Sequence, residues 1–168
     1  MIKHSLEAVV LAAGNSLRFK TRQTKQLSTI CGQPMVLFSL KVLRELEVSS
    51  AVIVGPQELD IKREIYASGI HDVTYFTQPE PLGTAHAVAC SQSWWTRDYL
   101  LVFSADVPLL TANIIEKMFA QHQASGAVVS FLTSYVLEPH GFGRVIELDG
   151  KVSIIEDSAC TDTQRSIN

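Results

Sequence analysis

A chain of 168 residues is long enough to bury one hydrophobic core and short for two, so the sequence predicts one domain over residues 1–168. Its composition, with 46% hydrophobic and 18% charged residues, is that of a globular protein and excludes a disordered or fibrous chain. The net charge of -3 provides no basic surface of the kind that a general nucleic-acid binder needs, so we expect no nucleic-acid partner.

Strand-type and helix-type patterns alternate along most of the chain. Short runs rich in Val, Ile and aromatic residues are typical of buried strands, and we expect them at residues 8–12, 51–54, 73–76, 99–103 and 127–132. Helical patterns cover residues 34–46, 58–67 and 84–95, and a fourth begins after Thr111 as N-cap. The alternation predicts an α/β fold with a mostly parallel sheet and helices on both faces. Ligands of such sheets bind beyond the carboxyl ends of the strands.

The first two helical patterns also predict which side chains make contacts. Pro34 suits the first helical position, and the apolar face of its helix comprises Met35, Phe38, Val42 and Leu46. In the second helix the expected contacts are Ile61 with Ile65, one turn apart, and the ion pair Glu58 with Lys62.

The C-terminal part predicts a β-hairpin. Two alternating segments flank Asp149-Gly150, which is the strongest short signal for a two-residue turn. Before the hairpin, Gly143 would let the backbone lie against a ligand ring, and after it Glu156 could accept hydrogen bonds from hydroxyl groups. A plain glycine bend with a surface glutamate is equally consistent with these residues.

The cysteines and the apolar runs favour a cytoplasmic location without a membrane partner. The three cysteines are far apart and lie in no Cys-x-x-Cys or His-x-x-x-His spacing, so neither a disulfide framework nor a zinc site is indicated. The N-terminal apolar run is interrupted by Glu7 and is much shorter than the roughly 20 residues of a membrane helix.

A candidate phosphate site follows the first predicted strand. The residues Leu11, Ala12, Ala13 and Gly14 lead into a loop that carries Arg18 and Lys25. Backbone N–H groups beside a glycine, together with nearby cations, are what a polyphosphate needs. The loop is neither a Gly-x-Gly-x-x-Gly element nor a P-loop, and an ordinary solvated loop is the alternative.

Asp106 is the candidate metal ligand. It follows a strongly apolar strand, Pro108 prevents the strand from continuing, and Ser104 and Ala105 leave the approach uncluttered. A carboxylate at the carboxyl end of a central strand is well placed to hold Mg2+ beside a phosphate. The alternative is a turn aspartate that hydrogen-bonds its own backbone.

A candidate base-binding element lies at residues 78–88, with the sequence QPEPLGTAHAV. The amide of Gln78 can recognise a base edge, and Gly83 and Thr84 permit close backbone approach at the start of a helix. The chemistry alone favours the alternative, a Pro-rich loop with Thr84 as N-cap, and His86 is interpreted as a packed or capping histidine.

The order of these elements resembles the uridylyltransferase domain of the N-acetylglucosamine-1-phosphate uridylyltransferase family over essentially the whole chain. The matching elements are the LAAG loop with Arg18 and Lys25, then PLGTAHAV, ADVPLL, GFGR, IIED and TDTQRSIN. The resemblance implies a Rossmann-like nucleotidyltransferase fold. It also implies the reaction of UTP with N-acetylglucosamine 1-phosphate to give UDP-N-acetylglucosamine and pyrophosphate.

The resemblance also implies roles for individual residues. Arg18, Lys25 and Asp106 would be catalytic, with Asp106 on Mg2+. The substrate-binding residues would be Leu11, Ala12, Ala13, Gly14 and Lys25 on the nucleotide, Gln78, Gly83 and Thr84 on uracil, Ser104 and Ala105 beside Asp106, and Gly143 and Glu156 on the sugar.

The chain departs from the family at several positions, among them Thr24, Ala85 and Ser104-Ala105, and two departures bear most on activity. Ser16 and Leu17 replace a glycine and a threonine of the nucleotide loop, and a positive φ at Ser16 would be strained. Beyond Asn168 the family continues into an Asn-Thr-Gly segment and a second metal-binding aspartate, so we expect the domain to be incomplete at its C-terminus. The sequence leaves oligomeric state open.

Two other functions therefore stay open. The sequence of residues 25–27, Lys-Gln-Leu, also resembles the opening of cytidylyltransferases acting on molybdopterin or methylerythritol phosphate, on the same fold. The changes at Ser16 and Leu17 are instead consistent with an inactive nucleotide-binding domain.

Overall fold

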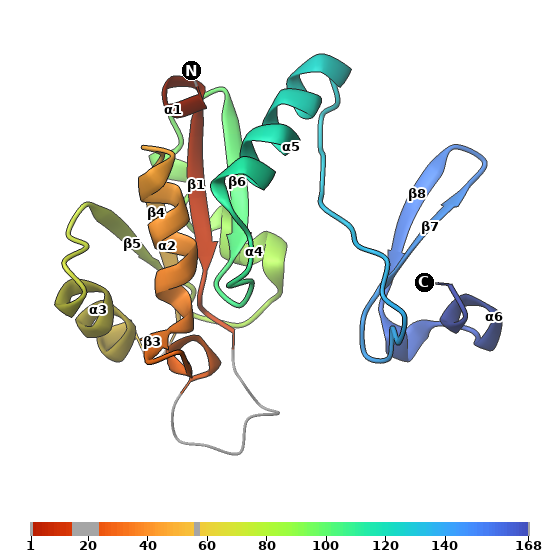
Figure 1. Ribbon diagram of the computed structural model, residues 1–168, viewed down its shortest axis with the longest axis horizontal. Coiled ribbons are helices and arrows are strands. Elements are labelled where there is room, and N and C mark those ends of the chain that lie inside the picture. Colours follow the sequence, from red (N-terminus) through yellow and green to blue (C-terminus); the bar gives the residue numbers. More distant parts are fainter. Residues whose placement is uncertain (1, 15–23, 56–57, 168) are drawn as a thin grey trace. The chain divides into compact units, whose positions relative to one another are not determined.

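The computed structural model describes residues 2–14, 24–55 and 58–167 (Figure 1). Arg18, Ser16 and Leu17, on which parts of the sequence interpretation rest, lie outside the described residues. The chain divides into two compact units, Met1–Gln121 and His122–Asn168, and each is described by itself.

The first unit is built on a four-stranded parallel sheet. The strands are β1 (Leu6–Leu11), β4 (Ser49–Val54), β5 (Val73–Thr77) and β6 (Tyr99–Ser104), and their order in the sheet is β5-β4-β1-β6. Val9 of the central strand β1 aligns with Ala51 of β4 and with Val102 of β6. Four of the five expected strands and the parallel sheet are therefore confirmed.

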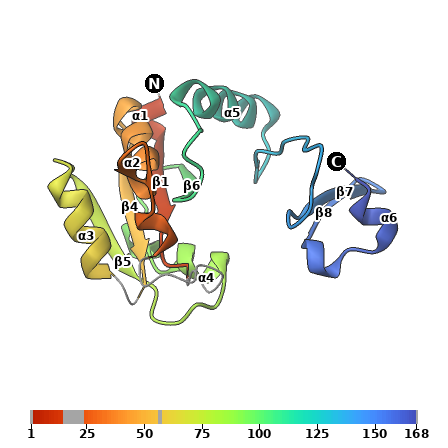
Figure 2. The same ribbon diagram turned by 60° about the horizontal axis from the view of Figure 1, so that its bottom comes forward.

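Helices cover both faces of this sheet, unequally. On one face α2 (Met35–Glu45), α3 (Glu58–Ala67) and α5 (Ala112–Ser125) pack against Val10 and Val52, with α2 in front of β1 and β4 in Figures 1 and 2. On the other face, Ala87 of the short helix α4 (Thr84–Ala89) packs against Val9 and Ile53. The remaining short elements of the unit are α1 (Ile2–Ser5), η1 (Lys25–Leu27), β2 (Thr29–Ile30), β3 (Gln33–Pro34) and η2 (Gln92–Trp94).

Helix α3 has the expected bounds and contacts. Ile61 and Ile65 are buried, and Lys62 lies 3.4 Å from Glu58.

The predicted face of α2 is correct only in part, since Leu46 is buried and Val42 packs against the core, whereas Met35 and Phe38 are not among the buried residues. In α2 the buried side chains are Val36, Leu37, Ser39, Leu40 and Leu43, and Pro34 is the N-cap rather than the first helical residue. The exposed charged side chains of Lys41, Arg44 and Glu45 share one side of this helix, so the sequence does contain a signal for the buried side that the apolar spacing alone did not give.

The helix expected at residues 84–95 ends early, at Ala89, and a short turn η2 follows. The hydroxyl of Ser91, which is fully buried, donates to the Val88 carbonyl at 2.8 Å and accepts from the Trp95 indole at 3.0 Å. Such local side-chain hydrogen bonds compete with helix propagation, which explains why the helical pattern is not completed.

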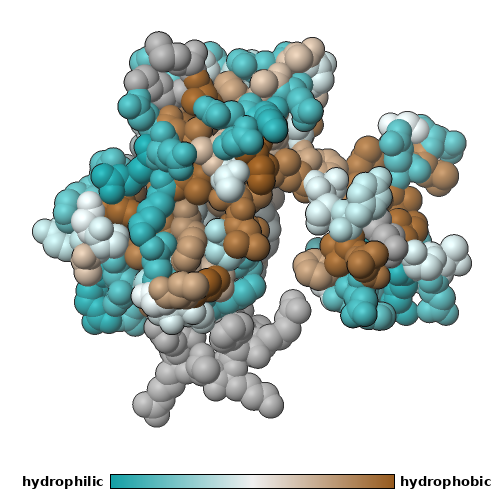
Figure 3. Space-filling view, in the orientation of Figure 1, coloured by the Kyte–Doolittle hydropathy of each residue, from teal (hydrophilic) through white to brown (hydrophobic). Residues whose placement is uncertain are grey.

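The strand expected at residues 127–132 is not formed. This stretch has strand-type side chains but pairs with none of the described strands, and Val128 is 95% exposed and Val129 74%. The preference of a residue for strands reflects its packing against neighbouring strands. Strand-type composition alone therefore does not produce a strand here, where no other described strand pairs with these residues. Brown surface in Figure 3 marks exposed apolar side chains of the second unit.

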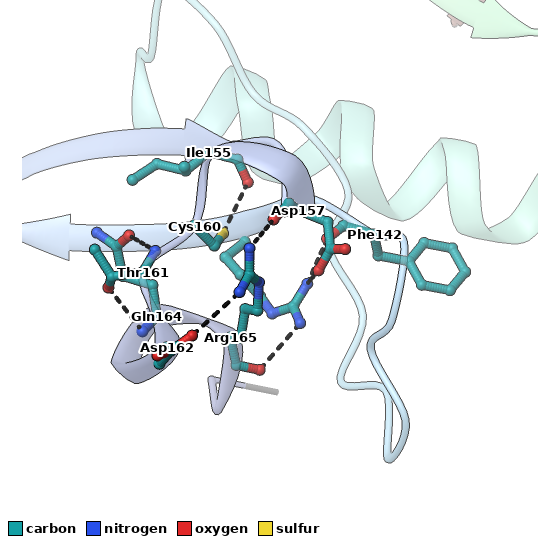
Figure 4. Close-up of polar contacts among 9 residues, drawn as sticks. Phe142, Ile155, Asp157, Cys160, Thr161, Asp162, Gln164 and Arg165 are labelled. Carbon is teal, nitrogen blue, oxygen red and sulfur yellow. Dashed lines mark hydrogen bonds and ion pairs between the residues drawn. The ribbon is translucent and has the colours of Figure 1, made fainter.

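The second unit is the predicted β-hairpin followed by a short helix. Strands β7 (Arg144–Leu148) and β8 (Lys151–Ile155) pair antiparallel, and positive φ angles at Asp149 (51°) and Gly150 (73°) are those of a type I′ turn. Then follow η3 (Asp157–Ala159) and α6 (Asp162–Arg165), which begins with a Thr161–Gln164 capping box (Figure 4).

Arg144 holds the parts of this second unit together. Its guanidinium is 3% exposed, and it donates to the carbonyl oxygens of Phe142 and Arg165, the latter at 3.0 Å. It also lies 3.5 Å from Asp157. These contacts join the hairpin to η3 and α6, and the partners Phe142, Asp157 and Arg165 are labelled in Figure 4.

Candidate functional site

The sheet topology determines where a ligand would bind. From β1 the chain adds β4 and then β5 on one side, and then crosses to place β6 on the other side of β1. The order therefore reverses between β1 and β6, and the crevice beyond the carboxyl ends of these strands is where parallel sheets bind ligands. Gly14, which follows β1, and Asp106, which follows β6, both belong to this edge.

Lys25 and Asp106 meet at this edge of the sheet. The Nζ of Lys25, in η1, lies 2.7 Å from Oδ2 of Asp106, and both side chains are more than a third exposed. The hydroxyl of Ser104 donates to the other carboxylate oxygen of Asp106. The structure thus brings together two of the three predicted catalytic residues, in a position that a ligand can reach.

Asp106 is kept ionised by these contacts. Partial burial by itself raises the pKa of its carboxyl, but the hydrogen bonds from Lys25 and Ser104 and the charge of Lys25 outweigh burial and lower the pKa below its usual range. The carboxylate is therefore negatively charged throughout the neutral range, as a ligand of a divalent cation must be.

The donor set around Asp106 fits Mg2+ in one particular way. Among the described residues no group of three or more His, Cys, Asp or Glu side chains is placed to hold a metal ion, so an all-protein cage is not formed there. Mg2+ is commonly held by one or two carboxylates, waters and substrate phosphates instead. Asp106 alone fits that mode of binding.

The end of β6 is fastened by a residue that the sequence did not single out. Ser39 of α2 is buried, and its hydroxyl donates to the backbone carbonyl of Ser104 at 3.2 Å. The buried Ala105 donates its N–H to the Leu11 carbonyl at 3.1 Å. Since Asp106 follows directly, these contacts position its carboxylate relative to β1 and α2.

The loop after β1 offers backbone rather than side chains. Ala12 and Ala13 are buried, whereas Gly14 is exposed. Its carbonyl accepts a long hydrogen bond, 3.4 Å, from the amide of Gln26. Gly55 approaches so closely that a Cβ there would lie 2.9 Å from the Ala13 carbonyl oxygen. Ala12 and Ala13 could therefore bind a nucleotide only through their main-chain atoms. Gly14, which has no side chain, would let the nucleotide approach the backbone closely.

The predicted base-binding residues lie together at the end of β5. The backbone N–H of Gln78 extends the sheet by donating to Val54, and its side-chain Nε2 donates to the Gly83 carbonyl at 3.1 Å. Gly83, with φ of 98°, is the N-cap of α4, and Thr84 is the first helical residue. The alternative with Thr84 as N-cap is therefore wrong by one residue.

His86 contacts the predicted base-binding residue Gln78, which its interpretation as a packed or capping histidine did not anticipate. Its Nδ1 lies 3.0 Å from the side-chain nitrogen of Gln78. The sequence signal was their spacing, which places an imidazole in the first turn of α4 and the amide directly after β5.

The predicted sugar-binding residues belong to the second unit, and their role stays a prediction. A Cβ at Gly143 would lie 3.4 Å from the Ile155 carbonyl, so close pairing with β8 is itself a reason for glycine here. Glu156 is exposed and precedes η3.

Solved structures of other proteins share this fold. A protein from Bacillus anthracis, described as a glucose-1-phosphate thymidylyltransferase, covers 91% of this chain and 65% of its own with a TM-score of 0.64. The CMP:2-keto-3-deoxy-manno-octonic acid synthetase complexed with CTP covers 73% and 49%, with a TM-score of 0.57. Both are 18% identical to this chain, so the likeness shows the nucleotidyltransferase fold.

The sequence then gives the family. The chain belongs to the MobA-like NTP transferase domain family, whose model matches residues 8–145. It is 35% identical over 166 residues to the bifunctional protein GlmU of Geobacter sulfurreducens, covering 96% of this chain and 35% of that protein. GlmU of Bacillus licheniformis is 37% identical over 165 residues, covering 95% and 35%. The chain thus spans about a third of the length of these relatives.

The comparisons confirm the expected nucleotidyltransferase class. They do not assign the individual site residues. No helix among those described combines the length and the apolar character needed to cross a membrane.

Proposed function

We propose that this chain carries a nucleotidyltransferase that joins UTP to N-acetylglucosamine 1-phosphate, with release of pyrophosphate and in the presence of Mg2+. The observation that carries the proposal is the Lys25–Asp106 pair at the carboxyl edge of β1 and β6. The sequence resemblance and the similarity to GlmU proteins support the choice of substrates.

The reaction needs charge neutralisation and alignment more than an acid or a base. A phosphate oxygen of the sugar phosphate attacks the α-phosphorus of the nucleotide, a new P–O bond forms, and the bond to the β-phosphate breaks to release pyrophosphate. The attacking oxygen is already ionised, so no proton has to be removed. This is consistent with a site built from a cation and a carboxylate.

Lys25 and Asp106 have complementary roles in this proposal. Lys25 places a positive charge where negative charge on the triphosphate must be stabilised. Asp106 would hold Mg2+, which when bound neutralises phosphate charge and helps to orient the triphosphate. Ser104 and Ser39 keep the carboxylate in place.

The deciding experiment measures pyrophosphate release from UTP, N-acetylglucosamine 1-phosphate and Mg2+. Asp106→Asn should abolish release, whereas the matched control Asp98→Asn, at an exposed residue before β6, should leave it unchanged. Wild-type release at the level of Asp106→Asn would refute catalysis by this chain. A higher rate with CTP than with UTP would replace the proposal by a cytidylyltransferase.

A further inference from the structure

The side chain of Gln78 carries an unused hydrogen-bond acceptor. The residue is only 6% exposed, and both described partners of the side chain are contacted by its nitrogen, Nε2. Its oxygen, Oε1, accepts no hydrogen bond from the described residues. Four side-chain atoms of the described residues are both fully buried and without a hydrogen-bond partner, and Oε1 of Gln78 is not one of them. Since Oε1 has no partner among the described residues, it must be partly accessible to solvent.

The orientation of this amide follows from its partners. The Gly83 carbonyl can only accept, so the atom 3.1 Å away must be the amide nitrogen. The second N–H is then directed to Nδ1 of His86 at 3.0 Å, which must present a lone pair. His86 therefore carries its proton on Nε2. Turning the amide over would place its oxygen against two acceptors and break both hydrogen bonds.

A fixed amide with only its oxygen available discriminates between pyrimidines. Uracil and thymine carry an N–H at ring position 3 and can donate to such an oxygen. Cytosine has an unprotonated nitrogen at that position, so two acceptors would face each other. A site that offers only an acceptor therefore favours the imide bases, because a buried polar group left unpaired is costly.

We propose that His86 is a specificity-determining positioning residue: it locks the Gln78 amide with Oε1 available to the base, so that the site selects uracil or thymine over cytosine. This inference rests on the proposed nucleotide-binding function and narrows it to one class of base. His86 acts through Gln78 and does not itself touch the nucleotide.

Position 86 provides variants that separate positioning from packing. His86→Leu keeps an apolar body but removes the acceptor, so the amide of Gln78 is held by Gly83 alone and can turn. His86→Asn restores an acceptor oxygen near the place of Nδ1. His71→Leu is the matched control, since His71 precedes β5 at the opposite end of the strand and contacts the Tyr66 ring.

The measurement is the dissociation constant of UTP and of CTP with Mg2+ and without sugar phosphate, by titration calorimetry. Wild type and His71→Leu should bind UTP more tightly than CTP. His86→Leu should reduce the ratio roughly fivefold, the equivalent of one ordinary hydrogen bond. His86→Asn should restore most of the ratio, and thermal unfolding of each variant reports whether it is folded.

A second measurement needs no variant. In protein labelled with 15N-histidine, His86 should show Nδ1 as the unprotonated nitrogen and Nε2 as the protonated one. A proton on Nδ1, or an unchanged ratio in folded His86→Leu, overturns the inference while nucleotide binding upholds the proposed function. Failure of wild type to bind either nucleotide overturns the proposed function and this inference with it.

Discussion

Lys25 and Asp106 lie 81 residues apart in the sequence and form an ion pair with 2.7 Å between Nζ and Oδ2. Their side chains are 40% and 36% exposed, and ion pairs so accessible contribute only about 0–1 kcal/mol to folding. The pair is therefore better explained by what it can bind than by the stability it adds.

Replacing Lys25 should separate activity from stability. Lys25→Met should lower the rate of pyrophosphate release by about a hundredfold or more, the usual effect of removing one preorganised charge-stabilising group. Its free energy of unfolding should change by less than about 1 kcal/mol in urea titrations. Lys41→Met, at an exposed lysine of α2, should change neither. Full activity in Lys25→Met would remove Lys25 from the transfer step.

Ser104→Ala should raise the pKa of Asp106. In wild type, burial raises this pKa, but the contacts from Lys25 and Ser104 lower it further than burial raises it, to below the ordinary 3.8. Loss of the Ser104 hydroxyl removes a donor that favours the ionised form. Carboxyl 13C NMR titration would measure the change, with Ser68→Ala, whose hydroxyl bonds the Ile65 carbonyl, as control. A lower pKa in Ser104→Ala would contradict the assignment.

Glu58 should make stability depend on acid pH. A hydrogen bond from Thr77 and the charge of Lys62 hold its pKa below the ordinary 4.5. A depressed folded pKa gives stability that is complete above the unfolded pKa and is lost as pH falls through the folded value. Thr77→Val should therefore flatten the decline of the melting temperature below pH 4.5. Glu80→Gln, at an exposed residue, should leave the decline intact.

Gly55→Ala should destabilise the first unit. The added Cβ would meet the Ala13 carbonyl at 2.9 Å, and a backbone atom cannot move aside as a flexible side chain can. Overpacking of this kind costs about 1–3 kcal/mol, which urea titration would detect. Gly14→Ala is the comparison, because its Cβ would meet only the end of Gln26, at 3.4 Å. Equal stabilities for the two variants would show that the loop tolerates a shift of Ala13.

The sequence predicted correctly those parts of the fold in which the local residue pattern by itself favours the structure that the surrounding elements also require. Helix 58–67 is amphipathic and was found with its bounds, and the Asp149-Gly150 turn requires positive φ angles that few residue pairs accept. The face of α2 was predicted only in part, because the apolar spacing was considered without the exposed charged residues Lys41, Arg44 and Glu45 that mark the opposite side. A strand was wrongly predicted at residues 127–132 because strand formation depends on a neighbouring strand, which composition does not reveal.

In the candidate site, too, some residues were predicted from the sequence and others were not. Asp106 and Lys25 were found because charged groups after buried strands are informative, although their contact across 81 residues is a product of the fold. Ser39 gave no signal, since one serine in an apolar helix has no pattern. His86 was interpreted from its own helix, whereas its partner Gln78 directly follows the preceding strand. Contacts between elements are what a single sequence leaves undetermined.

Arg144→Lys should loosen the second unit without affecting the first. Arg144 is 3% exposed and reaches two carbonyl oxygens and Asp157 with a planar fork that an ammonium group cannot reproduce. Loss of about one charged hydrogen bond, 1.5–3 kcal/mol, should speed amide hydrogen exchange in β7, β8 and α6 by roughly tenfold or more. Arg165→Lys, at a side chain 43% exposed, should have a smaller effect. Equal exchange in both variants would show that the buried guanidinium does not hold the hairpin and α6 together.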